Sequence, residues 1–432
     1  MRVLLLLSES WNDILHPNNN MTNWFLNCPN VEIWTISGSS VRPCNSISSH
    51  YFLVDESKMA KSILSRKRVG SIIEDSVNSS DADISLYVKK TKKIKKIFSS
   101  EIVRLLRDCV WRFGVYDEEL LKDFIHRSQP DIVFSQRKGS VKMCRLESLV
   151  MKYTSAPLVV YTGDDDFSLK QFNLNPIFWI RLFWTRKWIR KTAPCYKLLY
   201  SQSERQMNEY KEVFGVPTKF LVKSGHFKSN NIRSVFGSPI QLVYAGKLYC
   251  NRWKTLSLIT KSIREVNENA NEIKIQLNIY TPDFVSKKQH LLLDDGEHSI
   301  IHPAVSSDEL KEVYSQSDLL IHVEGLDLRN KLLTKDSFST KVMDCLSSGS
   351  AVLVVAWKEH SALKYLRQNE AALTACSYNE VRSIVNSIVS DPQILLKYAQ
   401  SAYNCGISHH QKEDIQASLL NDFSNVIANH KR

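Results

Sequence analysis

The residues whose types and spacing carry the clearest chemistry lie in one segment, 335–349. A Ser-Thr pair in this segment is suited to cap the start of a short helix, and Gly349 is suited to end it. The polar residues between them recur at positions i, i+3 and i+7, so a helix would hold them on one face. The residues at the predicted helix start and on that face are Ser339, Thr340, Lys341, Asp344 and Ser348.

This segment is followed by the apolar run Ala351 to Val355, which predicts a buried strand. A loop, a helix start and a polar helix face are therefore expected to meet at the end of a sheet. In a doubly wound sheet, ligands bind at that place, and the free N–H groups of a helix N-terminus favour a phosphate. Lys341 adds a full positive charge, so the segment predicts a phosphate-binding site.

A second basic loop follows another predicted strand. The strand ends at Gly246, and Lys247 and Arg252 come after it. Two cations beyond a strand-terminal glycine are suited to hold a diphosphate, because charged donors make the stronger hydrogen bonds to phosphate oxygens. The alternative interpretation is an ordinary loop whose charges face solvent.

Three consecutive carboxylates, Asp164 to Asp166, come directly after the predicted strand Leu158 to Thr162 and one glycine. Two interpretations stay open. The run either caps the next helix or projects carboxylates toward a donor or an acceptor. In the second case Asp165 is a candidate catalytic residue.

The elements that position these residues follow an alternating pattern. Short runs rich in Val, Ile, Leu and Tyr recur between helix-like segments, as expected of parallel sheets with crossover helices. One such helix is Glu118 to His126, which Ser-Gln-Pro then ends. The predicted strands are Val3 to Leu7, Val31 to Ser37, Asp131 to Ser135, Leu158 to Thr162, Lys197 to Ser201, Phe220 to Lys223, Ile240 to Gly246, Ile275 to Tyr280, Leu319 to Val323 and Ala351 to Val355.

The pattern is interrupted at Lys228 to Pro239, whose Asn, Ser, Gly and Pro residues are typical of a linker. A chain of 432 residues also exceeds one compact core. The sequence therefore predicts two Rossmann-like α/β domains, 1–230 and 231–410, that face each other across a cleft. Residues 411–432 have helical periodicity and are expected to pack back on the first domain.

The segment 335–349 resembles the retaining family 4 glycosyltransferases of the GT-B fold, in which two acidic residues are separated by seven positions. Asp336 and Asp344 have this spacing. The residues around them are similar to the variant of bacterial enzymes that assemble surface polysaccharides such as capsule and O-antigen. The resemblance implies that Asp344 accepts hydrogen bonds from ribose hydroxyls and that Asp336 lies near the transferred sugar. Both positions usually hold Glu, which is one methylene longer.

The resemblance covers most of residues 240–410. The family has Arg directly after the strand-terminal glycine and Lys about five positions on, whereas Lys247 and Arg252 stand in the inverse order. His302 and Val305 lie in the stretch that matches the family's base-pocket loop. The first domain matches more weakly, and the resemblance assigns it the acceptor.

The resemblance implies transfer of a sugar from a nucleotide-diphosphate sugar to a glycan or lipid-linked acceptor, with retention of configuration, in cell-surface polysaccharide synthesis. Negative charge accumulates on the departing diphosphate. Lys247, Arg252, Lys341 and the helix start near Ser339 are placed to neutralise it, so preorganised positive charge can replace a divalent metal. No metal or other cofactor is therefore expected, because the nucleotide-sugar is a substrate.

Composition limits the function classes further. With 43% hydrophobic and 24% charged residues the chain has a globular balance. Nine scattered cysteines without metal-ligand spacing favour a reducing, cytoplasmic setting. The net charge of +12 favours a polyanionic partner. The opening apolar run is too short for a signal sequence, and no run reaches the roughly 18 apolar residues of a spanning helix.

Association with an anionic membrane on its inner face is also expected. Lys89 to Arg107 predicts a surface-lying helix with an apolar stripe of Ile94, Ile97, Phe98, Ile102 and Leu105 opposite basic residues. A second candidate, 178–191, interleaves aromatic and basic residues. The alternative for both is a core helix with solvated charges. The basic residues of the first candidate are Lys93, Lys96, Arg104 and Arg107.

Three other function classes stay open. A metal-dependent GT-A transferase would use Asp164 to Asp166 as its DxD motif, and its activity would be lost in a chelator. A nucleic-acid-binding protein would fit the charge, but the chain has no helix-turn-helix, zinc or RNA-binding signature, so no nucleic acid is expected. A non-catalytic scaffold with the same fold is the third.

Overall fold

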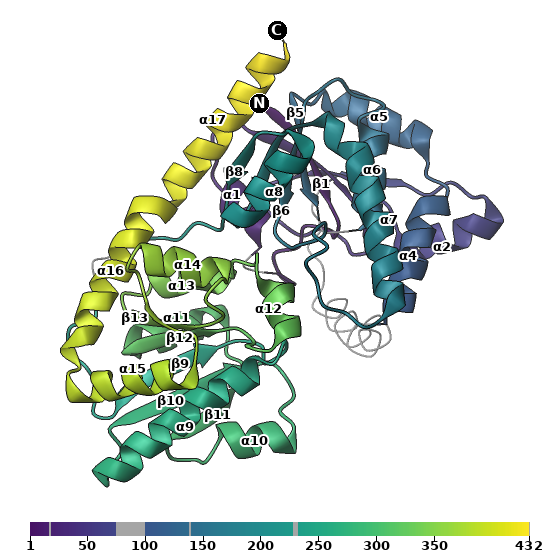
Figure 1. Ribbon diagram of the computed structural model, residues 1–432. Coiled ribbons are helices and arrows are strands. Elements are labelled where there is room, and N and C mark those ends of the chain that lie inside the picture. The colour runs from purple at the N-terminus through teal and green to yellow at the C-terminus, as the bar shows by residue number, and fades with distance from the viewer. Residues whose placement is uncertain (17–18, 75–99, 138–139, 228–231, 432) are drawn as a thin grey trace. The chain divides into compact units, whose positions relative to one another are not determined.

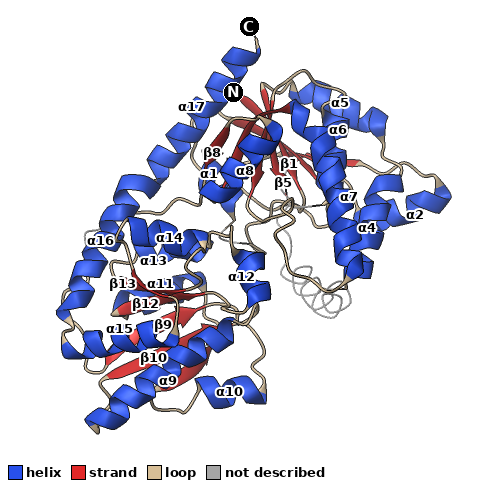
Figure 2. Cartoon of the chain, in the orientation of Figure 1, coloured by secondary structure: helices blue, strands red, loops and turns tan. Residues whose placement is uncertain are grey.

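The computed structural model describes residues 1–16, 19–74, 100–137, 140–227 and 232–431. The chain divides into two compact units. The first comprises Met1–Leu221 together with Glu413–Arg432, and the second comprises Val222–Lys412. Each unit has a central sheet covered by helices on both faces (Figures 1 and 2).

The first unit holds an eight-stranded sheet in the order β4-β3-β2-β1-β5-β6-β7-β8. Only β3 and β4 pair antiparallel; all the other neighbours are parallel. The strands are β1 (Arg2–Leu7), β2 (Glu32–Ser37), β3 (His50–Leu53), β4 (Ser71–Glu74), β5 (Ile132–Arg137), β6 (Leu158–Thr162), β7 (Tyr196–Ser201) and β8 (Thr218–Phe220).

The central position of β1 in the sheet explains its apolar sequence. Val3, Leu5 and Leu7 face one hydrophobic core, and Leu4 and Leu6 face the other. A strand buried on both faces reads as a continuous apolar run, because neither face meets water. The helices that cover the sheet are α1 (Asn20–Phe25), α2 (Glu56–Ser65), α4 (Glu101–Phe113), α5 (Glu118–Ser128), α6 (Val141–Val150), α7 (Pro176–Thr192), the short 3-10 helix η1 (Ala193–Cys195), α8 (Glu204–Phe214) and α17 (Lys412–His430).

The second unit holds a six-stranded, fully parallel sheet in the order β11-β10-β9-β12-β13-β14. Its strands are β9 (Ile240–Ala245), β10 (Ile275–Thr281), β11 (Ser299–Pro303), β12 (Leu319–Val323), β13 (Ala351–Val355) and β14 (Leu373–Ala375). Its helices are α9 (Arg252–Ala270), α10 (Lys287–Leu293), α11 (Ser307–Gln316), α12 (Leu328–Thr334), α13 (Thr340–Leu346), α14 (Ser361–Gln368), α15 (Tyr378–Ser390) and α16 (Gln393–His410).

The predicted α/β class with two parallel sheets is confirmed. The predicted strand Phe220 to Lys223 is misplaced along the chain, because β8 ends at Phe220. Four strands had no prediction: β3, β4, β11 and β14. β14 has three residues and β4 is an edge strand without a fully buried side chain, so neither has a long apolar run. In the predicted linker, 228–231 lie outside the described residues, and 232–239 are irregular.

Helix α17 packs on the first sheet, as its periodicity predicts (Figure 1). Phe423 is fully buried, and its ring centroid lies 5.2 Å from that of Phe134 on β5. The Tyr200 hydroxyl donates a hydrogen bond of 2.8 Å to Asp422 Oδ2. The first unit therefore includes a segment that is distant in sequence. None of the described helices is both long enough and apolar enough to cross a membrane.

Replacing Phe423 by Ala should lower the free energy of unfolding of the first unit by about 3–5 kcal/mol, because it empties a buried aromatic site. Urea unfolding followed by tryptophan fluorescence measures this, since every tryptophan except Trp253 and Trp357 lies in that unit. Asn425→Ala, on the exposed side of the same helix, is the control and should change stability by less than about 0.5 kcal/mol. An equal effect of both variants would contradict the packing of α17.

Candidate functional site

A small recess lies at the carboxyl end of the second sheet. The strands β9 and β12 end there, and the start of α13 lies beside them. Parallel strands place their carboxyl ends along one edge, so loops far apart in sequence meet at this edge. The recess is lined by Tyr244, Ala245, Arg252, Tyr314, Ile321, His322, Val323, Ser339, Lys341 and Cys345.

The Lys341 amine is the main cation of this recess. It donates a hydrogen bond of 2.7 Å to the carbonyl oxygen of Ala245, and within the described part of the chain it has no carboxylate partner. Burial, together with the nearby Arg252 guanidinium, lowers the pKa of Lys341 to about 8. An anion that approaches a desolvated ammonium group of this kind stabilises its charged form.

Gly246 makes the position of the Lys341 amine possible. A Cβ atom at residue 246 would collide with Lys341 Nζ and would lie 2.9 Å from the Tyr244 hydroxyl oxygen. That hydroxyl donates a hydrogen bond of 2.7 Å to the carbonyl of Lys247 and so holds the loop after β9. Glycine is therefore required at position 246 by the close approach of the Lys341 amine. Its backbone conformation is not the reason, since its φ is not left-handed.

Arg252 forms a buried ion pair at the first residue of α9. Its Nε and Nη2 atoms lie 3.1 and 2.6 Å from the two carboxylate oxygens of Glu324, which follows β12 directly. Burial raises the pKa of the Glu324 carboxyl, and Arg252 opposes that shift. His322 Nε2 lies 3.5 Å from Glu324 Oε1, and burial beside Arg252 holds the pKa of His322 well below its usual range.

The acidic pair predicted by its spacing is placed by α13 and the loop before it. Asp336 is buried in the loop between α12 and α13. Asp344 lies on α13, and its Oδ1 accepts a hydrogen bond of 2.8 Å from Lys223 Nζ. Ser339 occupies the N-cap position of α13, but its hydroxyl makes no capping bond and Thr340 is the first helical residue. The Ser339 hydroxyl therefore remains available to a ligand.

His302 and Val305 lie on β11 and in the loop after it, outside the lining of the recess. The His302 ring stacks on Tyr280 with centroids 4.7 Å apart, and its Nε2 is 2.8 Å from Asn278 Oδ1. Burial lowers the pKa of His302, which favours a neutral ring.

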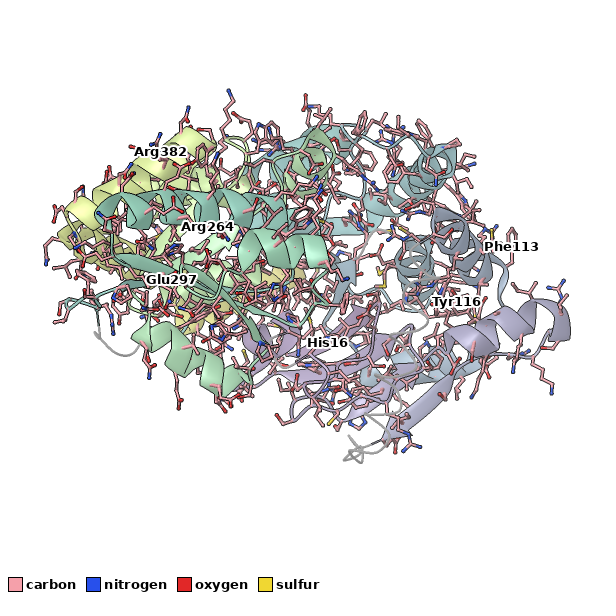
Figure 3. The ribbon with its side chains drawn as sticks, turned by 90° about the horizontal axis from the view of Figure 1, so that it is seen from below. His16, Phe113, Tyr116, Arg264, Glu297 and Arg382 are labelled. Carbon is pink, nitrogen blue, oxygen red and sulfur yellow. The ribbon has the colours of Figure 1, made fainter. Side chains whose placement is uncertain are left out.

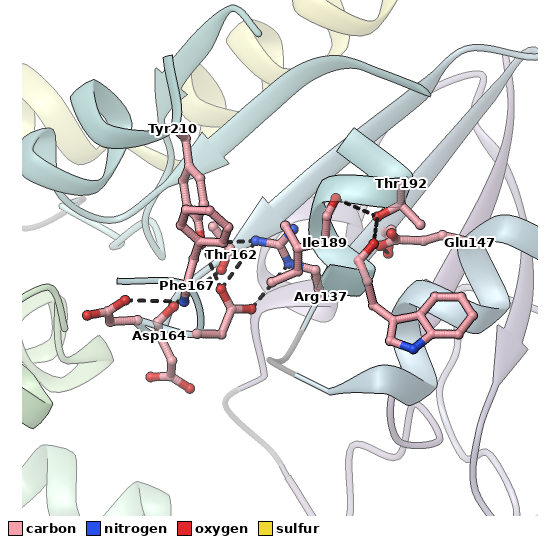
Figure 4. A network of polar contacts seen from close by, with 12 residues as sticks. Arg137, Glu147, Thr162, Asp164, Phe167, Ile189, Thr192 and Tyr210 are labelled. Atoms are coloured by element: carbon pink, nitrogen blue, oxygen red, sulfur yellow. Dashed lines mark hydrogen bonds and ion pairs between the residues drawn. The ribbon is translucent and has the colours of Figure 1, made fainter. Parts of the chain in front are cut away.

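Two of the three carboxylates after β6 make different contacts in the first unit. Asp166 is buried with Arg137, with Nε to Oδ2 at 3.2 Å, and it accepts a hydrogen bond of 2.7 Å from Tyr210 (Figure 4). Asp165 accepts hydrogen bonds from the backbone N–H of Ser168 at 2.8 Å and from Gln171. Asp165 thus holds the turn after β6 and does not cap the next helix, α7, whose N-cap is Asn175. Its contact with a donor or an acceptor stays a prediction. Within the described residues, no cluster of three metal-ligating side chains occurs.

The structure brings together Arg252, Ser339 and Lys341 of the predicted set. It also adds His322, Glu324 and Tyr244, which the sequence did not predict as residues of this site. Glu324 had an available signal, because it follows a buried strand directly, and Asp164 to Asp166 follow one after a single glycine. Asp165 lies in the first unit and the recess lies in the second.

Known proteins resemble this chain in sequence and in fold. Residues 240–421 match the family model described as glycosyl transferase-like. No curated protein sequence matches the chain. The sucrose-phosphate synthase of Thermosynechococcus elongatus superposes with a TM-score of 0.62 at 8% identity, over 99% of this chain and 100% of that chain.

Two further solved structures are similar. The E. coli trehalose-6-phosphate structure bound with UDP-2-fluoro glucose has a TM-score of 0.59 at 10% identity, with 98% of each chain covered. The GtfA/B complex has a TM-score of 0.53 at 12% identity, over 73% of this chain, which spans 61% of that chain. The fold and the family model together define the class as an enzyme of the glycosyltransferase type with the GT-B fold.

Replacing Arg252 by Met should destabilise the second unit by about 3–5 kcal/mol, because it leaves the buried Glu324 carboxylate without its counter-charge. The double variant Arg252→Met with Glu324→Gln should recover at least half of that loss. A double-mutant cycle of unfolding free energies measures the coupling. If the single variant costs less than about 1 kcal/mol, the ion pair is not closed in solution.

Proposed function

We propose that this chain transfers a sugar from a nucleotide-diphosphate sugar to a glycan or lipid-linked acceptor. The observation that carries the proposal is the Lys341 amine, which is desolvated at the carboxyl end of the second sheet and has no carboxylate partner in the described chain. Such a group fits the phosphates of a donor. The similar E. coli structure was solved with UDP-2-fluoro glucose, which supports a donor of this chemistry.

Each predicted donor residue has a proposed part. Lys341 and Lys247 contact the diphosphate, and the backbone N–H groups at Ser339 and Thr340 add donors at the start of α13. Arg252 contributes mainly through its Nη1 atom, because Glu324 engages Nε and Nη2. These positive groups are held near the leaving group before the reaction begins. They can stabilise the departing diphosphate without a metal ion.

The remaining parts follow the resemblance. Asp344 accepts a hydrogen bond from the ribose through the oxygen that Lys223 leaves open. His302 and Val305 border the base, and Asp336 lies near the transferred sugar. Asp165 is proposed on the acceptor side, where its exposed neighbour Asp164 makes the same loop available. Retention of configuration and a place in cell-surface polysaccharide synthesis complete the proposal.

Thermal stabilisation by a panel of UDP, GDP, TDP and CMP sugars tests the function, because only binding to the folded state raises the melting temperature. One base should stabilise the wild type by several degrees, and release of its nucleoside diphosphate should follow when acceptor is added. Lys341→Met should lose both effects. Lys331→Met, on α12 of the same unit and outside the lining of the recess, is the control and should keep them. A wild type that no donor stabilises contradicts the proposal.

Binding of the free nucleoside diphosphate should weaken as pH rises above about 8. Below this pH the Lys341 amine of the unbound protein is charged, and above it the amine is neutral, so binding must take up a proton. We expect the affinity to fall by up to about tenfold per pH unit between 8 and 9.5.

Calorimetric titration over this pH range measures that slope. Lys341→Met should bind weakly and lose most of the slope. Lys247→Met, whose side chain is exposed, should bind more weakly than wild type but keep it. Parallel slopes in all three proteins would assign the effect to ionisation of the ligand and remove Lys341 from the site.

A further inference from the structure

Large exposed apolar side chains gather on two helices of the first unit, α4 and α7. On α4, Ile102, Leu106 and Phe113 are 54%, 58% and 56% exposed. On α7, Ile180 and Phe183 are 58% and 55% exposed. Phe113, the last residue of α4, is labelled in Figure 3. Exposed apolar side chains that gather on one surface of a protein often mark a contact with a partner.

The two helices lie side by side (Figure 1), and contacts near both ends show that they run in the same direction. Near their starts, Arg181 Nε of α7 lies 2.9 Å from Glu101 Oε2 of α4. Near their ends, the Arg112 guanidinium of α4 lies 5.5 Å from the centre of the Trp188 ring of α7. These two contacts fix the facing side of each helix along its length.

The apolar residues of both helices point to the same side of this pair. With about 100° between successive residues, the α4 stripe lies about 110° from the residues that face α7. The α7 stripe lies about 120° from the residues that face α4, in the opposite rotational sense. Because the helices are parallel, opposite rotations from facing sides bring the two stripes onto one common surface.

The same surface becomes basic toward the end of α7. Lys187, Arg190 and Lys191 continue the stripe of Ile180 and Phe183 at intervals of three, four and seven residues, and all three are exposed. None of them forms an ion pair with a described residue. The surface therefore combines exposed apolar side chains with three positive charges that have no ion-pair partner among the described residues.

The basic residues that the sequence assigned to a membrane contact have other partners. Arg107 forms two hydrogen bonds of 2.6 and 2.7 Å with the Glu56 carboxylate of α2, and Arg104 lies 2.9 Å from Glu101. Lys93 and Lys96 lie outside the described residues, as do Ile94, Ile97 and Phe98. Leu105 is only partly exposed. The positive charge available for a partner is therefore on α7.

We infer that α4 and α7 form a docking face for an anionic lipid bilayer. Helices that lie in a membrane interface place apolar side chains at the acyl boundary and basic side chains among the headgroups, and this face offers both. Each basic residue near an anionic surface contributes attraction that falls off within a Debye length. A second copy of the chain would bring the same positive charge against itself, which disfavours a dimer through this face.

This inference goes beyond the proposed sugar transfer, since bilayer docking does not depend on donor binding. Its test is co-sedimentation of the full chain with phosphatidylglycerol-containing vesicles and with pure phosphatidylcholine vesicles. The wild type should bind the anionic vesicles at least about tenfold better. Raising the salt to about 0.5 M should release it, because the Debye length then falls to roughly 4 Å.

Two variants separate the contributions. The apolar variant Leu106→Ser, Ile180→Ser and Phe183→Ser, and the charge variant Lys187→Glu, Arg190→Glu and Lys191→Glu, should each lose at least about tenfold in binding. Matched controls lie on the second unit, where the exposed side chains allow the same changes of chemistry and charge. They are Val235→Ser with Phe284→Ser and Leu291→Ser, and Lys287→Glu with Lys288→Glu and Lys397→Glu.

Each outcome decides the inference. Controls that bind like the wild type while both α4–α7 variants do not would support it. Equal loss in the controls would show attraction by net charge alone and overturn it. Wild type that does not sediment, or that forms a dimer in light scattering which the apolar variant dissolves, would also overturn it. Unchanged near-UV circular dichroism in the variants establishes that they fold.

Discussion

The hydrogen bond from Lys341 Nζ to the Ala245 carbonyl joins the first turn of α13 to the end of β9, which are 96 residues apart in sequence. It exists because parallel strands place their carboxyl ends along one edge and because Gly246 has no Cβ in the way. The bond uses one of the three donors of the ammonium group and leaves the others for a ligand. The position of the cation is therefore set by the sheet itself, and a mobile surface side chain would not hold it there.

Each unit has a buried arginine–carboxylate pair at the carboxyl ends of adjacent strands. Arg137 ends β5 and pairs with Asp166 after β6, while Arg252 follows β9 and pairs with Glu324 after β12. Breaking such a pair leaves an uncompensated buried charge, so each pair holds its two loops together. The two units thus use the same device to fix the loops at the end of the sheet where ligands bind in this fold class.

The sequence predicts features that are local and fails on those that are not. Lys341 and Ser339 follow from one helical pattern with its cap, and β1, β6 and β12 follow from continuous apolar runs. The predicted helix end at Gly349 is wrong, because α13 ends at Leu346 and leaves Ser348 beyond it. The pairing of Arg252 with Glu324 joins residues 72 positions apart, so no local pattern announces it. The turn of Asp165 also depends on the fold, because its carboxylate accepts a hydrogen bond from the backbone N–H of Ser168.

The return of α17 to the first sheet has a consequence for folding during synthesis. The second unit is one continuous stretch of chain, so it can close as soon as it has been made. The first unit needs Phe423 in its core and therefore stays incomplete until after the whole second unit has been translated. Most domains mature in the order of synthesis. In this chain the order is reversed. The β1–β8 sheet must keep one apolar face open to chaperones or solvent while the second unit folds.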